Sequence, residues 1–166
     1  SHSISVPAGT AEVRFMVYWL DWEGDPAAAK ALVNDLNLTV NPPGGGTLLP
    51  YVLDPTPSVA ALSAPATTGV DDLNNMEQVR VTAPASGTYT INVEGLAVPQ
   101  GPQKYYVVWE FVQDQIEVTY PIGGEGFVPG ELEKIRWDAY GDTGSFNVEY
   151  STNGGASWTT IGSAAG

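Results

Sequence analysis

Apolar and polar residues alternate along most of the chain, which is the pattern of β-strands rather than of helices. Val13, Phe15, Val17 and Trp19 lie on one face of the segment 12–19 at a period of two. The same alternation predicts strands that include 36–40, 79–81 and 89–93, and an aromatic, β-branched run predicts a longer strand over 104–112. A single short helix is predicted over 26–32, with proline near its start. The sequence therefore predicts an all-β, antiparallel fold.

The segment 41–72 reads as a long connection, because it is rich in Pro, Gly, Ser and Thr and has few periodic apolar positions. We expect one short strand inside it, over 48–53.

A second group of strands follows a boundary between Asp114 and Gln115. It comprises 116–120, 133–138, 145–150 and 159–161, with Asn153-Gly154 as a predicted two-residue hairpin turn. An immunoglobulin-type sandwich needs ~7 strands, so these strands are too few for a whole one. The predicted domains are therefore 1–114, a β-sandwich, and 115–166, part of an Ig-like β-sandwich.

The charge of the chain excludes several functions. Its 166 residues include 19 acidic and 6 basic side chains and no cysteine, which gives a net charge of -13. An acidic surface repels nucleic acid and anionic membranes, and the chain holds no run of ~18 apolar residues that could insert into a membrane. The absence of cysteine removes thiolate catalysis, disulfides and cysteine-based zinc sites. We expect neither nucleic-acid binding nor membrane insertion.

Catalytic motifs are also missing from the sequence. His2 is the single histidine, and there is no Gly-x-Ser-x-Gly elbow, phosphate-binding loop or His-Glu-x-x-His pair. A Ser-His-Asp triad needs an imidazole between a carboxylate and a hydroxyl. The sequence therefore predicts a chain without catalytic residues of its own.

Acidic and amide side chains gather beside predicted strand ends, where backbone carbonyls are free to bind calcium. The alternative interpretation is that these residues shape turns or, as for Asn34 and Asn75, cap loops. The sequence leaves both interpretations open. The candidate calcium ligands are Asp21, Asp35, Asp71, Asp72, Asn75 and Glu77.

Among the tryptophans, Trp19, Trp109 and Trp137 lie within strand patterns and are expected in the core. Trp22 lies in a loop and Trp158 at the end of a hairpin. An exposed row of aromatic side chains on a sheet would instead indicate sugar binding.

Motifs over residues 3 to about 112 resemble the jelly-roll domain that follows the catalytic domain of some bacterial subtilisin-like serine proteases, a relative of the P domain of proprotein convertases. The most specific pair is Leu-Val-Asn-Asp-Leu at 32–36 followed by Asn-Asn-x-Glu at 74–77. That family usually has Asp at the position of Asn37. Further matches are Ala8-Gly9-Thr10, Val17-Tyr18-Trp19, Asp21, Ala83-Pro84-Ala85-Ser86-Gly87-Thr88-Tyr89 and Val98-Pro99-Gln100-Gly101-Pro102-Gln103.

The remaining residues resemble bacterial Ig-like modules. The matching motifs are Pro121-Ile122-Gly123-Gly124-Glu125, Ile135-Arg136-Trp137 and the run 150–158. The segment 151–158 also resembles the Asp-box hairpin of β-propellers, but a propeller needs one such motif in each blade.

These resemblances imply a non-catalytic C-terminal accessory region of a secreted subtilisin-like serine protease, whose partner is the catalytic domain of the same polypeptide. They also imply a structural calcium ion and a bacterial protein that is secreted or held at the cell surface. The alternatives are a module that binds polysaccharide or a cell surface, and a spacer in an adhesin-like protein.

Overall fold

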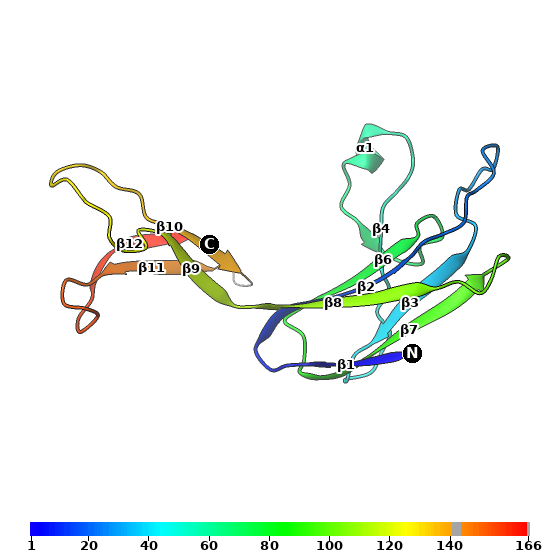
Figure 1. Ribbon diagram of the computed structural model, residues 1–166, viewed down its shortest axis with the longest axis horizontal. Coiled ribbons are helices and arrows are strands. Elements are labelled where there is room, and N and C mark those ends of the chain that lie inside the picture. Colours follow the sequence, from blue (N-terminus) through cyan, green and yellow to red (C-terminus); the bar gives the residue numbers. More distant parts are fainter. Residues whose placement is uncertain (141–143, 166) are drawn as a thin grey trace. The chain divides into compact units, whose positions relative to one another are not determined.

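The computed structural model describes residues 1–140 and 144–165. It divides the chain into two units, Ser1–Phe111 (unit 1) and Val112–Gly166 (unit 2), as Figure 1 shows. The sequence placed the boundary between Asp114 and Gln115.

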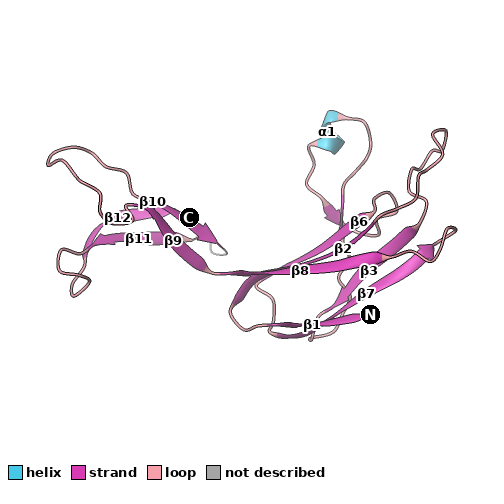
Figure 2. Cartoon of the chain, viewed as in Figure 1, coloured by secondary structure: helices cyan, strands magenta, loops and turns pink. Residues whose placement is uncertain are grey.

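Unit 1 is built around two three-stranded antiparallel sheets (Figure 2). The first has the order β1-β7-β3, with β1 over His2–Val6, β7 over Gly87–Ala97 and β3 over Asp35–Asn41. The second has the order β6-β2-β8, with β6 over Met76–Thr82, β2 over Thr10–Trp19 and β8 over Tyr105–Gln113. The predicted all-β, antiparallel fold is confirmed.

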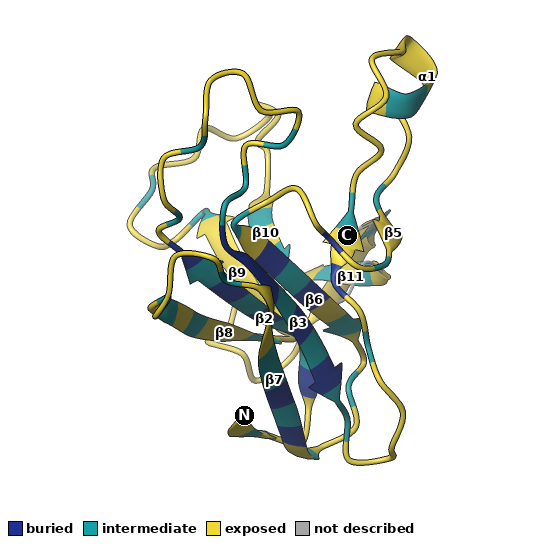
Figure 3. Cartoon of the chain, turned by 90° about the vertical axis from the view of Figure 1, so that its right-hand side faces the viewer, coloured by how far each residue is buried: buried dark blue, intermediate teal, exposed yellow. Residues whose placement is uncertain are grey.

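The core lies between these two sheets and uses the residues of the period-two pattern. Val13, Phe15, Val17 and Trp19 are fully buried on β2, and the ring of Phe15 lies 5.5 Å from that of Tyr89 on β7. Figure 3 shows buried positions alternating with partly exposed ones along the central strands. Burial of these apolar side chains is the main stabilising contribution in unit 1. The remaining core residues are Val6, Leu36, Leu38, Val40, Val79 and Ile91.

The connection between β3 and β6 contains little regular structure. Its short strands β4, Tyr51–Val52, and β5, Thr67–Thr68, pair with each other, and between them the four-residue helix α1 covers Val59–Leu62. The strand predicted over 48–53 is thus shorter, and Leu48 forms a single bridge to Val40. Among the described residues, no helix is long and apolar enough to cross a membrane.

The helix predicted over 26–32 is wrong. Asp25 accepts the Ala27 amide at its side chain and the Ala28 amide at its carbonyl, which closes one turn, and the chain then continues without regular structure. Most of this alanine-rich segment is exposed, and of its apolar side chains Leu32 packs against the core, so too little apolar surface is buried to extend the turn into a helix.

Unit 2 consists of two separate strand pairs. β9, Gln115–Tyr120, pairs with β10, Arg136–Tyr140, and β11, Ser145–Tyr150, pairs with β12, Thr159–Ala165. None of the residues whose burial is described in unit 2 is buried, and Trp137 is only partly covered.

The predicted two-residue turn at Asn153-Gly154 is also wrong. Tyr150 pairs with Thr159, so the whole segment 151–158 forms the loop, and the positive φ angles fall on Gly154 and Gly155. The Asn153 side chain holds this loop, because its Oδ1 accepts the Ser157 amide and its Nδ2 donates to the Ser157 hydroxyl.

Candidate functional site

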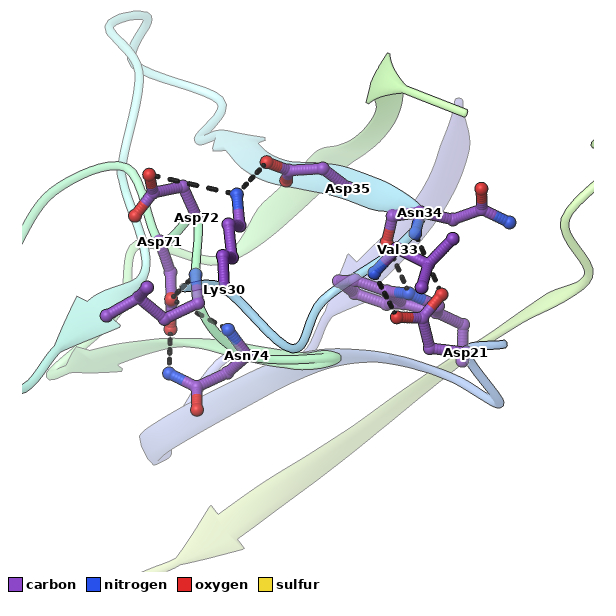
Figure 4. Close-up of polar contacts among 10 residues, drawn as sticks. Asp21, Lys30, Val33, Asn34, Asp35, Asp71, Asp72 and Asn74 are labelled. Atoms are coloured by element: carbon purple, nitrogen blue, oxygen red, sulfur yellow. Dashed lines mark hydrogen bonds and ion pairs between the residues drawn. The ribbon is translucent and has the colours of Figure 1, made fainter. Parts of the chain in front are cut away.

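Asp21 directs its carboxylate at the main chain that enters β3. Its Oδ2 accepts the Val33 amide at 2.7 Å and its Oδ1 accepts the Asn34 amide at 2.8 Å (Figure 4). Both oxygens of Asp21 therefore hold a loop, as the turn-and-cap interpretation predicts.

Asn34 is fully buried and joins three segments of unit 1. Its Nδ2 donates to the Gln100 carbonyl and to Gln103 Oε1, and its Oδ1 accepts the Gln100 amide, at distances of 2.8–3.1 Å. Its main-chain carbonyl accepts the indole N–H of Trp19 at 3.0 Å. We call Trp19, Asp21, Asn34, Gln100 and Gln103 the Asn34 joint. In a buried hydrogen-bond network of this kind, loss of one partner strongly lowers stability.

Asp71 and Asn75 make contacts of the same structural kind. Asp71 Oδ1 accepts the Leu73 and Asn74 amides, and its Oδ2 accepts the Asn74 side-chain amide at 2.7 Å. Asn75 donates its side-chain amide to the Trp19 carbonyl at 2.8 Å. These bonds fix the turn before β6.

Asp35 and Asp72 lie on either side of one lysine. The Lys30 ammonium is 3.0 Å from Asp35 Oδ2 and 3.8 Å from Asp72 Oδ2. Asp35 is buried, whereas 64% of the Asp72 side chain is exposed. Figure 4 shows that the contacts of Lys30 and those of Asp21 form separate groups.

The Glu77 side chain links one sheet to the edge strand of the other. It lies on β6, an edge strand of its sheet, and its Oε2 accepts the Leu38 amide of edge strand β3 at 2.7 Å. The residue is 1% exposed. Three buried oxygens have no hydrogen-bond partner among the described residues, namely Asp35 Oδ1, Asn37 Oδ1 and Glu77 Oε1. We call Asp35, Asn37 and Glu77 the β3–β6 joint.

The surroundings of Glu77 disfavour its charged form. Burial raises its pKa from the ordinary 4.5 to about 7, and the negative charges of Asp71 and Asp35 add to that rise, while the Leu38 amide opposes it. A carboxylate in this place is stabilised by a proton or by a cation.

Asp35, Asn37 and Glu77 carry oxygens of the kinds that calcium prefers, two carboxylates and one amide. Three other predicted calcium ligands, Asp21, Asp71 and Asn75, form hydrogen bonds with main-chain groups. No three acidic, histidine or cysteine side chains in the described ranges come close enough together to bind a metal ion. Asn37, whose buried Oδ1 is unpartnered, was not among the predicted ligands, and its difference from the Asp that is usual in the resembled family was the available signal.

The His2 side chain contacts Tyr105. Its Nε2 is 3.2 Å from the Tyr105 hydroxyl and its ring meets the Tyr105 ring edge-on. Tyr105 in turn packs against the core, so this imidazole covers a side chain of the sandwich.

The sequence matches no model of a known protein family, and no curated protein is significantly similar to it.

Proposed function

We propose that the chain is a non-catalytic C-terminal accessory region of a secreted, bacterial subtilisin-like serine protease. In this proposal unit 1 is the jelly-roll module and unit 2 is part of an Ig-like module. The observation that carries it is the Asn34 joint. Motif residues far apart in the sequence meet there in hydrogen bonds that fix the fold, as expected of motifs that define a structural domain and not a reaction centre.

The proposed role is to pack on the catalytic domain of the same polypeptide and stabilise it. The polar groups of the joint are occupied by partners within unit 1, so the joint is available for holding this domain together and not for turnover of a substrate.

A polysaccharide- or surface-binding module is the second candidate. Tyr18 and Tyr106 favour it, because their rings stack at 6.5 Å on one face of the β6-β2-β8 sheet. Lys104 lies 5.1 Å from the centre of the Tyr106 ring, however, so that ring is partly engaged. A stacked pair leaves less aromatic ring surface free for a sugar than a row of exposed rings does. We therefore prefer the accessory role.

We further propose that calcium is held at the β3–β6 joint by Asp35, Asn37 and Glu77. The unpartnered oxygens support this assignment, because buried polar atoms in proteins almost always have a partner. A divalent ion would turn the repulsion between the carboxylates into attraction and so fasten the edges of the two sheets.

The purified chain should not hydrolyse peptides, because its imidazole contacts Tyr105 and the sequence has no nucleophile elbow. Incubation with denatured casein and a chromogenic peptide measures this. Hydrolysis that persists through purification and disappears in His2→Ala would contradict the proposal.

A further inference from the structure

The outer face of the β6-β2-β8 sheet carries two arginines that share one carboxylate. Glu12 has 8% of its side chain exposed and pairs with both Arg14 and Arg80. The strand register places Arg14 directly opposite Arg80, and the next residues on this face, Met16 and Gln78, also lie opposite each other. The buried carboxylate therefore orients both guanidinium groups on the sheet.

Beside this face lies a groove of about 680 Å³. Its sheet side includes Met16, Met76, Gln78 and Arg80, and the connection between β3 and β6 supplies Tyr51 and Leu53 on the other side. Met76 is 52% exposed and Leu53 is 66% exposed. The groove thus combines an apolar surface with one cation, and methionine side chains adapt readily to different bound groups.

The charges around the groove select the kind of ligand. Asp71 also lines it, but both of its oxygens accept bonds from its own turn. Arg80 directs Nε and Nη2 at one oxygen of Glu12, so its Nη1 and the second N–H of Nη2 are left to a ligand. Unit 1 has only four basic side chains, Arg14, Lys30, Arg80 and Lys104, so the cation at this groove stands out on an acidic domain.

We propose that this groove binds an extended peptide segment that places an acidic side chain against Arg80 and apolar side chains over Met16 and Met76. Opposite charge at Arg80 supplies the selectivity, and the apolar contacts supply area. This site does not depend on the identity of the parent protein or on calcium.

The test uses the full chain and fluorescein-labelled hexapeptides of alternating leucine and aspartate, with asparagine or lysine in place of aspartate as matched probes. Fluorescence anisotropy should show the aspartate peptide binding about tenfold more tightly than the asparagine peptide, because a charge-assisted hydrogen bond is the stronger one. The lysine peptide should bind more weakly still. Amide chemical shifts should change around 51–53 and 76–80.

Arg80→Gln should weaken the aspartate peptide about tenfold and leave the asparagine peptide almost unchanged. The matched control is Arg14→Gln, since Arg14 pairs with the same Glu12 and has a similar exposed fraction but does not line the groove. Met76→Ser, at an exposed position, should weaken both peptides.

Three results would overturn the proposal. The first is equal affinity for the aspartate and asparagine peptides, and the second is an equal loss of affinity in the Arg80 and Arg14 variants with unchanged melting temperatures. The third is self-association through this face in sedimentation, without any binding of peptide.

Discussion

Replacing Asn34 by alanine should lower the free energy of unfolding of unit 1 by about 3 kcal/mol. The change removes the partners of the Gln100 amide, the Gln100 carbonyl and Gln103 Oε1 at a fully buried position. Each buried polar group left without a partner costs about 1–3 kcal/mol, and exposed Gln100 and the Gln103 side chain can bond to water and recover part of that. At ~4–8 °C for each kcal/mol, the melting temperature should fall by on the order of 15 °C.

Asn74→Ala is the matched control for this measurement. Asn74 is exposed and its side chain donates only to Asp71, so the expected cost is below about 1 kcal/mol. Thermal unfolding followed by circular dichroism compares the two variants. Equal losses would mean that the Asn34 joint contributes no more than a surface turn.

Much of the fold could be predicted from the sequence because burial and strand periodicity are directly linked. Val13, Phe15, Val17 and Trp19 alternate in the sequence and are all buried in the structure. Trp109 follows the same pattern and is 49% exposed, so its expected place in the core is wrong. It lies on β8, an edge strand of its sheet, where fewer neighbouring side chains cover each residue.

The polar site could be predicted only in part, because local sequence does not reveal the tertiary partner of an acidic side chain. Asp21 and Asp35 look alike in the sequence, yet one binds two main-chain amides and the other faces Lys30 with one oxygen unpartnered. Glu77 was predicted as a calcium ligand, but the sequence did not indicate its burial, which follows from the meeting of β6 with β3. The wrong helix over 26–32 has a related origin, since a weak local propensity forms one turn at Asp25 and is not extended by packing of an apolar face.

Calcium should raise the melting temperature of unit 1 at pH 8 by more than about 10 °C. An ion that binds only the folded state at a hundredfold excess over Kd adds about 2.7 kcal/mol, which converts at ~4–8 °C for each kcal/mol. Glu77→Gln should abolish this rise, because the amide can still accept the Leu38 N–H but carries no charge. Asp72→Asn is the control, since Asp72 contacts the same Lys30 from an exposed position and should keep the response.

In chelator the stability of unit 1 should depend on pH through the protonation of Glu77 and not through a bound cation. The pKa of Glu77 is raised in the folded state to about 7 from 4.5, so the stability that its protonation provides is present below pH 4.5 and is lost as the pH rises through 7. The loss amounts to at most about 3 kcal/mol. Differential scanning calorimetry at pH 5 and pH 8, with calcium, magnesium or chelator, measures both effects. Identical melting temperatures in all three solutions at pH 8 would exclude calcium from the β3–β6 joint.

The most direct test of the accessory role examines the native polypeptide. Antibodies raised against unit 1 would capture it from the culture medium of the organism that encodes the chain, and a fluorophosphonate probe would label any activated serine nucleophile. We predict a labelled polypeptide larger than the 17.5 kDa of this chain, with labelling lost after heat denaturation. A captured polypeptide that carries no label would contradict the assignment to a serine protease.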